Sequence, residues 1–362
     1  MTDHIRLFVP GPVEVREEIL QAQTAWMIGH RSGEFAELYA RLQPKLKQSY
    51  KTEKGRVYTY TSSGSGVWES ASRNLVRAEH SILHLVCGAF SERWAEYSEA
   101  NGKQVHRLEV PWGQAVPVEM LKEALTMQRY DAVAMVYNET STGVLNPLPE
   151  YAEIVADYPH TLLLVDAVSA YLGADIQFDA WGLDVCFASS QKAMALPPGI
   201  AFAAISDAAL ARAETVKHRG AYFDMLQLEK SHQKNNTPAT PPIALMFAAD
   251  KQLDDVLTEG LEARFQRHAT MRDMTHEWLA KHGFELFSQD GFHSPTVSTI
   301  KNTKGIDIGA LNKFLRSEHH MAISNGYGKI KDQTFRIGHM GDHQPEHLQA
   351  LLAAIDEFIA KS

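Results

Sequence analysis

The sequence is poor in cysteine and has no long apolar run. Its 362 residues include two cysteines, Cys87 and Cys186, both in apolar, strand-like surroundings. We expect both to be small, buried apolar side chains rather than reactive thiols or members of a disulfide framework. No apolar stretch approaches the roughly 20 residues that a membrane-spanning helix needs.

Positive charge is also not in excess. The formal net charge is -9, from 35 Lys and Arg against 44 Asp and Glu. Nucleic acids and anionic membranes select for basic patches, so we expect neither as a partner. The opening residues, MTDHIRLFVPGP, lack the basic stretch and following apolar stretch of a secretory signal. Together with the scarcity of cysteine, this favours a cytoplasmic protein.

What the sequence does contain is a regular alternation of short apolar runs and amphipathic stretches. The runs predict buried strands at 57–61, 82–86, 105–110, 131–136, 162–165, 185–188 and 200–205. Helical spacing fills most intervals, as at 68–78, 92–101 and 118–127. This alternation predicts an α/β fold with a mostly parallel sheet flanked by helices.

The two ends of the chain differ from its middle. Pro10 and Pro12 disfavour helix, so residues 1–15 are expected to form an extended arm before a helical region from 16 to about 50. Residues 231–242 predict an irregular loop and 243–282 are mostly helical. Strand, helix, strand and helix then follow at 296–300, 308–318, 334–337 and 345–360. We predict a large domain over 16–258 and a smaller C-terminal α/β domain over 259–362.

Lys192 occupies an unusual place, after a predicted buried strand and before the rigid turn Pro197-Pro198-Gly199. Either its stem reaches to water, or the amine is kept partly desolvated. Burial lowers the pKa of a lysine, and only the neutral amine attacks an aldehyde. The second interpretation makes Lys192 a candidate carrier of an aldehyde cofactor.

Asp166 ends the aliphatic run Leu162–Val165. It is either a helix cap or strand-end carboxylate, or the counter-ion of a pyridinium nitrogen. Its distance from Lys192 leaves room for a crossover to the next strand. Both residues would then lie at the C-terminal edge of the sheet, where open α/β folds bind ligands.

A third feature is the segment Thr61-Ser62-Ser63-Gly64-Ser65-Gly66, between a strand and a helix. Backbone N–H groups at a helix start and serine hydroxyls can bind a phosphate. The segment fits neither the Walker pattern, nor the dinucleotide pattern G-x-G-x-x-G, nor the nucleophile elbow G-x-S-x-G.

In their order along the chain, these motifs resemble class V aminotransferases of fold type I, the alanine–glyoxylate and serine–pyruvate branch. The resemblance covers nearly the whole sequence. It is carried by VPGP at 9–12, SGSG at 63–66, NETSTG at 138–143, VDAV at 165–168, SQK at 190–192, PPG at 197–199, TPATPP at 237–242 and FRIGHMG at 335–341.

The resemblance implies an enzyme that carries pyridoxal 5'-phosphate (PLP) as a Schiff base on Lys192. Asp166 would pair with the pyridinium nitrogen, Phe90 and Val168 would cover the two faces of the ring, and Thr140 would lie beside it. The phosphate would be bound by Ser63, Gly64, Ser65 and Gln191. It would also be bound by Thr240 of a neighbouring subunit, which implies a homodimer with shared active sites.

Arg336 matches the residue that binds the substrate α-carboxylate, and a guanidinium suits bidentate binding of that group. The implied reaction moves an amino group from a small amino acid, of the alanine or serine type, to a 2-oxo acid such as glyoxylate or pyruvate in two half-reactions. Aspartate, phosphoserine or another class V substrate is the alternative. A dicarboxylate would need a second cation, and Arg31, Arg219 and Lys329 have no predicted role.

Other functions remain as alternatives. A cysteine desulfurase-like lyase needs a mobile cysteine, which the loop 324–328 lacks. A non-catalytic PLP-fold binding protein would not need Lys192, Asp166 and Arg336 together, and a serine hydrolase at Ser63 or Ser65 lacks the elbow pattern. We expect no metal site, because Pro345 separates the histidines at 339, 343 and 347.

Overall fold

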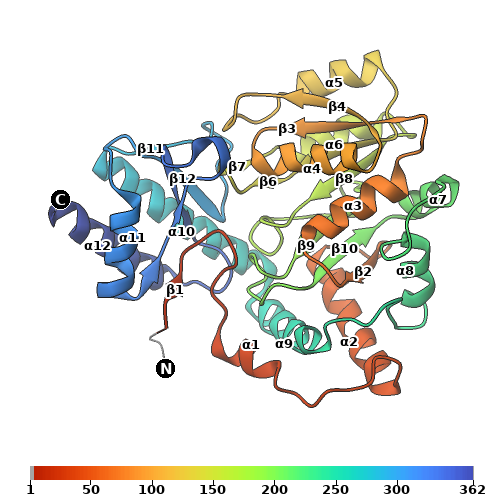
Figure 1. The fold of residues 1–362 in the computed structure, drawn as a ribbon, viewed down its shortest axis with the longest axis horizontal. Helices are drawn as coiled ribbons and strands as arrows, with labels where there is room; N and C mark the ends of the chain where they lie inside the picture. The colour runs from red at the N-terminus through yellow and green to blue at the C-terminus, as the bar shows by residue number, and fades with distance from the viewer. Residues whose placement is uncertain (1–3, 362) are drawn as a thin grey trace.

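The computed structural model describes residues 4–361. Residues 1–3 and 362, the outer ends of the predicted arm and small domain, lie outside the described residues. Figure 1 shows two layered parts side by side, a larger one on the right and a smaller one on the left. Helices α9 (Ile243–Glu259) and α10 (Leu261–His282) connect them. The domain boundary at 258/259, which stays a prediction, falls at the end of α9.

Seven strands form the central sheet in the order β2-β10-β9-β8-β5-β3-β4. Neighbours from β4 to β9 run parallel, whereas β10 is antiparallel to both β9 and β2. The predicted mostly parallel sheet is therefore confirmed. The strands are β2 (Arg56–Tyr60), β3 (Ser81–Val86), β4 (Gln104–Glu109), β5 (Ala132–Val136), β8 (Leu162–Asp166), β9 (Val185–Ser189) and β10 (Ala201–Ile205).

Helices cover both faces of this sheet, and strand side chains alternate between them. In β5, Ala132 and Ala134 pack in the same apolar cluster as one set of helices, whereas Val133 and Met135 pack with the other. Burial on both faces explains why the strands are continuous apolar runs. The first set is α3 (Gly64–Leu75), α4 (Ala89–Ala100), α7 (Asp207–Thr215) and α8 (Met225–His232), and the second is α2 (Gly33–Ser49), α5 (Val118–Met127), α6 (Leu148–Ala156) and α9.

The smaller part is an antiparallel sheet with helices packed against it. Its strand order is β11-β12-β15-β14, and α10, α11 (Ile308–His319) and α12 (Pro345–Lys361) share its apolar cluster. The strands are β11 (Glu285–Leu286), β12 (Val297–Lys301), β14 (Ser324–Asn325) and β15 (Thr334–Gly338). Short elements complete the chain: the β6–β7 ribbon (Asn138–Glu139 and Val144–Leu145) and the 3-10 helix η1 (Gly328–Ile330). None of the helices over residues 4–361 has the length and apolar composition needed to cross a bilayer.

The N-terminal arm joins the two parts. Strand β1 (Arg6–Leu7) pairs in parallel with β13 (Met321–Ala322), and the Gly338 N–H donates to the Phe8 carbonyl at 2.8 Å. A few residues later, the Val13 N–H donates to the Gln191 carbonyl at 3.1 Å. The arm therefore runs from the small sheet directly to the loop that carries Lys192.

The structure corrects three predicted boundaries. The helical region from 16 to about 50 is divided into α1 (Glu17–Ala22) and α2, because Ser32 caps α2 and accepts a hydrogen bond from the Phe35 N–H. The helical run 243–282 is interrupted at Gly260, whose φ of +87° is left-handed. The loop predicted from 231 begins after His232, where α8 ends. Apolar spacing alone does not detect such caps and breaks.

Candidate active site

A cavity of about 170 Å³ lies at the C-terminal edge of the central sheet, where β5, β8 and β9 end. Nine of the eleven predicted site residues line it, whereas Arg336 and Thr240 do not. A larger cavity of about 900 Å³, between α10, β11 and residues 112–114, contains none of them. The smaller cavity is lined by Ser63, Gly64, Ser65, Trp68, Phe90, Val136, Asn138, Thr140, Asp166, Val168, Ser169, Gln191 and Lys192.

Lys192 is buried beneath the N-terminal arm. Its Nζ donates a hydrogen bond to the Pro10 carbonyl and lies 5.8 Å from the centre of the Phe90 ring. Gly11, with a φ of +130°, gives the stem room, since a Cβ there would approach Lys192 Cδ to 2.7 Å. Burial, followed by the charge of Arg336, lowers the pKa of Lys192 to about 8. About a tenth of the amine is therefore neutral and nucleophilic at pH 7.

Asp166, the last residue of β8, is a buried carboxylate without a cationic partner. Trp68 Nε1 donates to Oδ2 at 2.7 Å, and the Val168 N–H donates to Oδ1 at 2.8 Å. Within residues 4–361 the carboxylate forms no ion pair, and burial raises its pKa to about 7. The two neutral donors fix the orientation of the carboxylate but do not compensate its charge. A cation placed in the cavity would do so.

The start of α3 is suited to an anion. Ser63 is the N-cap residue but makes no side-chain capping hydrogen bond, and the first turn has no acidic side chain. A Cβ on Gly64 would lie 2.7 Å from Val168 Cγ2, so only glycine allows the helix start to approach the cavity wall this closely. Free N–H groups at such a position bind phosphate. Gln191 lines the same cavity, with its Oε1 held by Ser189 Oγ at 2.6 Å.

Two walls of the cavity are fixed by their neighbours. Phe90, at the start of α4, stacks on Tyr327 with ring centres 5.3 Å apart and an interplanar angle of 17°. Thr140 Oγ1 and Ser169 Oγ lie 2.5 Å apart. These contacts hold the lining rigidly, which favours a ligand of one defined shape.

Arg336 lies on β15, close behind this lining. Its Nε donates to the Asn325 carbonyl at 3.0 Å and its Nη1 to the Thr140 carbonyl at 3.3 Å. The guanidinium carbon lies 5.5 Å from the centre of the Tyr327 ring. Burial lowers the pKa of Arg336 to about 10, and none of the described carboxylates forms an ion pair with it. A buried guanidinium without an acidic partner is a strong candidate binder for a ligand carboxylate.

Thr240 is apart from the cavity of its own chain. Its side chain is exposed, with Oγ1 3.5 Å from His30 Nε2. Arg31 donates to the carbonyls of Thr237 and Pro238 and so joins the turn before α2 to the same loop. The position is one that a second subunit could approach.

Sequence reasoning missed several residues of the site. Trp68, Asn138 and Ser169 line the cavity. Glu139 lies behind it and accepts hydrogen bonds from the Ser91 N–H at 3.0 Å and from Ser141 Oγ at 2.6 Å. Trp68 had a detectable signal, since it lies about one helical turn after the predicted phosphate-binding segment at the start of α3. Glu139 had no comparable signal, because nothing in the sequence indicates that Ser91 of α4 lies next to it.

The positions of the cysteines and histidines are relevant to two alternatives, a cysteine nucleophile and a metal site. Cys87 and Cys186 are buried, outside the cavity, and burial raises the pKa of each thiol, which does not suit a mobile nucleophile. His339 is held by Ser298 and His343 stacks on Phe8. Over residues 4–361, no three His, Cys, Asp or Glu side chains are grouped as metal ligands.

Comparisons with known proteins agree with this geometry. A family model described as "Aminotransferase class-V" matches residues 16–330. The chain is 31% identical over 346 residues to the L-aspartate–glyoxylate aminotransferase of Paracoccus denitrificans, covering 94% of this chain and 87% of that protein. It is 30% identical over 356 residues to the serine–glyoxylate aminotransferase of Arabidopsis thaliana, covering 97% and 89%. The crystal structure of an alanine–glyoxylate aminotransferase from Nostoc sp. superposes with a TM-score of 0.94 at 29% identity, covering 99% and 96%.

Proposed function

Because this chain belongs to the class V aminotransferase family, we propose that it uses PLP to transfer the amino group of a small amino acid, such as serine or alanine, to glyoxylate or pyruvate. The observation that carries the proposal is Asp166, a buried carboxylate at the cavity wall without a cation. A protonated pyridine nitrogen supplies that cation. The three relatives named above, which act on aspartate, serine or alanine, share glyoxylate in their names.

The residues of the cavity fit PLP group by group. Lys192 would hold the aldehyde carbon, Asp166 the ring nitrogen, and the start of α3 with Ser63, Ser65 and Gln191 the phosphate. Phe90, Val168 and Thr140 would enclose the ring. When bound, PLP supplies an electron sink that lowers the barrier to removing the substrate α-proton.

The remaining steps belong to side chains of the protein. The Lys192 amine, with its lowered pKa, can accept the α-proton and return it during each half-reaction. Arg336 would bind the substrate carboxylate and fix the direction of the Cα–H bond. The arm over Lys192 excludes water from the amine.

A donor with one carboxylate suits the charges around Arg336. Of the cations without a predicted role, Arg219 pairs with Asp224 at 3.0 Å and Lys329 pairs with Glu92 at 2.9 Å. Arg31 is engaged by loop carbonyls. None of the three is free, within residues 4–361, to bind a second carboxylate, which supports serine or alanine over aspartate.

The test begins with the purified protein, which should be yellow. Borohydride reduction followed by peptide mapping should find the cofactor on Lys192. Serine, alanine and aspartate are then paired with glyoxylate and with pyruvate, and kcat/KM is compared. A colourless protein, or cofactor on another lysine, would refute the PLP assignment, whereas a preference for aspartate would refute only the choice of donor.

We expect Arg336→Lys to lower kcat/KM by roughly 10²-fold in both half-reactions, about 2.7 kcal/mol of transition-state stabilisation. Lysine keeps the charge but loses the planar fork that grips a carboxylate. Cofactor content should be unchanged. Arg93→Lys is the matched control, because Arg93 also contacts Tyr327, donating to its hydroxyl at 2.9 Å, but does not line the cavity. Equal effects of the two substitutions would contradict the assigned role.

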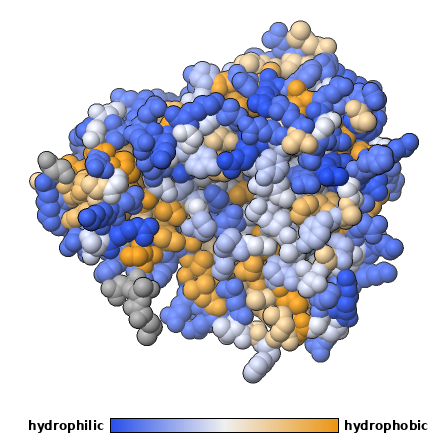
Figure 2. Space-filling view, in the orientation of Figure 1, coloured by the Kyte–Doolittle hydropathy of each residue, from blue (hydrophilic) through white to orange (hydrophobic). Residues whose placement is uncertain are grey.

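We also propose a homodimer in which Thr240 reaches the cofactor phosphate of the other subunit. Figure 2 shows apolar residues gathered over the lower centre of one face, whereas its periphery is largely hydrophilic. Leu20, Trp26 and Met27 are exposed by 45%, 94% and 69% in a single short segment. Exposed apolar clusters of this kind mark association surfaces.

Thr240→Ala should weaken PLP binding by about 1 kcal/mol or slightly more, as expected for one lost hydrogen bond to a charged group. Thr240→Ser keeps the hydroxyl and should bind PLP as the wild type does. The affinity is measured by titrating the cofactor-free protein, and the assembly by sedimentation. A catalytically active monomer would disprove the shared site.

A further inference from the structure

A single buried side chain, Arg264 of α10, contacts the loops that follow the main site residues. Its side chain is 2% exposed. Nη2 donates to the carbonyl of Ala193, the residue after Lys192, at 2.9 Å, and Nε donates to the carbonyl of Leu172, in the loop after Asp166, at 3.1 Å. Loops that leave two different strands of the central sheet are therefore joined by one planar group.

The same guanidinium reaches the small sheet. Nη2 also donates to Asp342 Oδ1 at 3.0 Å, and Asp342 lies in the turn that follows β15, the strand of Arg336. Nη1 donates to Glu259 at the end of α9, at 2.9 Å. Arg264 thus connects the segments that carry Asp166, Lys192 and Arg336 to the helix pair that joins the two parts of the chain.

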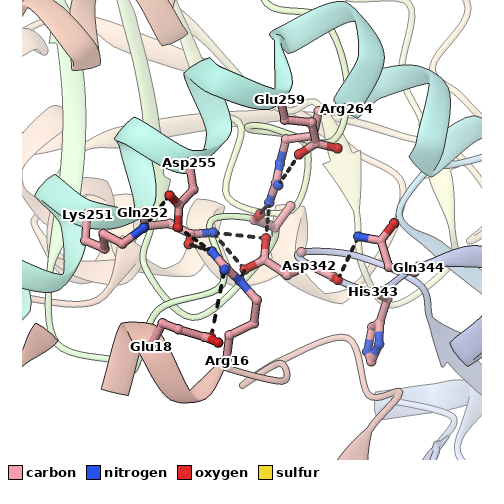
Figure 3. A network of polar contacts seen from close by, with 12 residues as sticks. Arg16, Glu18, Lys251, Gln252, Asp255, Glu259, Arg264, Asp342, His343 and Gln344 are labelled. Atoms are coloured by element: carbon pink, nitrogen blue, oxygen red, sulfur yellow. Dashed lines mark hydrogen bonds and ion pairs between the residues drawn. The ribbon is translucent and has the colours of Figure 1, made fainter. Parts of the chain in front are cut away.

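A second arginine joins the N-terminal arm to this centre. Arg16 Nε donates to Asp342 Oδ2 at 2.6 Å, and its Nη2 donates to Asp255 and Gln252 of α9, both at 2.9 Å. Figure 3 shows Arg264 of α10 and Arg16, the residue before α1, approaching Asp342 from different parts of the chain. Burial opposes ionisation of Asp342, but the charges of Arg264 and Arg16 outweigh it and keep the pKa of the carboxyl below its usual range.

We propose that Arg264, anchored on Asp342, is a positioning residue that holds the Lys192 loop against the small sheet and so sets the place of the Lys192 amine relative to Arg336. This inference rests on the proposed transaminase function. Arg264 touches neither the cavity nor any expected ligand, so its effect must pass through the backbone that it binds.

The backbone at both contacts needs such support. Leu172, whose own carbonyl is bound, and Ala195, two residues after the bound carbonyl of Ala193, have left-handed φ values of +62° and +54°. Non-glycine residues adopt this conformation only when the surroundings hold them in it. Lysine at 264 would retain the charge but could not direct donors to Ala193, Leu172 and Asp342 at once.

The test compares Arg264→Lys with Arg267→Lys. Arg267 lies on the same helix, also pairs with Glu259 at 2.7 Å and also binds the turn after β15, through the Gly341 carbonyl at 3.2 Å. It has no contact with the Lys192 or Asp166 loops, so it controls for the general cost of disturbing this network. Two quantities are measured: kcat and KM of the holoenzyme, and the pH dependence of competitive labelling of Lys192 in the cofactor-free protein.

We expect Arg264→Lys to lower kcat by roughly 10- to 100-fold, since a displacement on the order of 1 Å is costly in an active site. Donor KM should change less than kcat. The labelling pKa of Lys192 should rise by roughly one unit, because a looser loop admits water to the amine. Arg267→Lys should leave kcat within about twofold of the wild-type value. It should leave the labelling pKa of Lys192 within about a few tenths of a unit of the wild-type value.

If the two variants lose stability and kcat equally and the labelling pKa of Lys192 stays constant in both, Arg264 is only a structural residue and the proposal fails. If Arg264→Lys does not fold, Asp342→Asn takes its place, because it weakens the anchor of Arg264 but keeps the arginine. The proposal then requires the same rise in the labelling pKa of Lys192. A wild-type protein inactive with every donor would refute the proposed function, yet the labelling result would still decide the role of Arg264.

Discussion

Replacing Lys192 with alanine is expected to lower kcat by on the order of 10⁴-fold, the upper range for loss of a general acid–base group. The amine is the one basic nitrogen among the described side chains that line the cavity whose pKa lies near neutral. Asp166, the other titrating group there, is assigned to the ring nitrogen and would not take over the proton. The covalent attachment of the cofactor is lost as well, and borohydride should fix no label. The measurements are single-turnover rates and reduced-peptide maps.

Lys103→Ala serves as the control for this substitution. Lys103 is also a partly buried lysine with a lowered pKa, and its Nζ donates to the Val76 carbonyl at 2.7 Å, far from the cavity. It should keep full activity. A small primary amine, added to the Lys192→Ala variant, should enter the space left by the side chain and restore part of the rate. Undiminished turnover by Lys192→Ala would exclude the lysine as the proton-transfer group.

Asp166→Asn is expected to lower kcat/KM by about 10³-fold, within the 3–5 kcal/mol typical of removing one partner of a buried charge pair. The amide keeps the shape of the carboxylate but offers no negative charge to a ring nitrogen. It also places an NH₂ group against either the Trp68 indole N–H or the Val168 N–H. PLP affinity should fall in parallel, as measured by equilibrium titration.

Asp184→Asn is the matched control. Asp184 is a half-buried carboxylate that also has two neutral donors, Ser206 Oγ at 2.7 Å and the Leu163 N–H at 2.9 Å, and burial raises its pKa too. It precedes β9, at the opposite edge of the sheet from the cavity. We expect lower stability but kcat/KM within about threefold of the wild type. A drop as large as that of Asp166→Asn would mean that the effect is structural.

Asp166 also predicts a dependence of protein stability on pH. Burial raises the pKa of Asp166 to about 7 in the folded protein, against about 3.8 for the ordinary group. The folded state therefore binds the Asp166 proton more tightly than the unfolded state does. The stabilisation that results is fully present below about pH 4 and is lost as the pH rises to about 7. Asn does not titrate and so does not lose this stabilisation. Between these two pH values, the free energy of unfolding of cofactor-free Asp166→Asn should therefore rise by about 2–4 kcal/mol relative to that of the cofactor-free wild type. A constant difference between the two would disprove the raised pKa.

Much of the fold could be predicted because its strands are buried on both faces. Such strands are unbroken apolar runs, and each of the seven was located within one residue at either end. The direction of β10 could not be found in this way, since an apolar run has no sign of its orientation. The two-residue strands β1, β6, β7, β11, β13 and β14 were also missed, because they exist only through their partners.

The site could be anticipated where it depends on strand ends. Ser63, Asp166 and Lys192 follow three apolar runs, and parallel topology brings such ends to one edge. Arg264 could not be assigned, because a guanidinium in a helix gives no sign of its distant partner. Arg264 is paired with carbonyls 71 and 92 residues away, which only the folded chain brings near.

The arm that covers Lys192 also has a consequence for the order in which the chain assembles during translation. Arg6 pairs with Met321, so at about 5–20 residues per second the arm waits roughly 15–60 s for its partner strand to be made. Every strand of the central sheet has left the ribosome well before then. We therefore expect the large sheet to form with its cavity open to the solvent, so that the proposed cofactor could enter before β1 pairs with β13 and the arm closes over it.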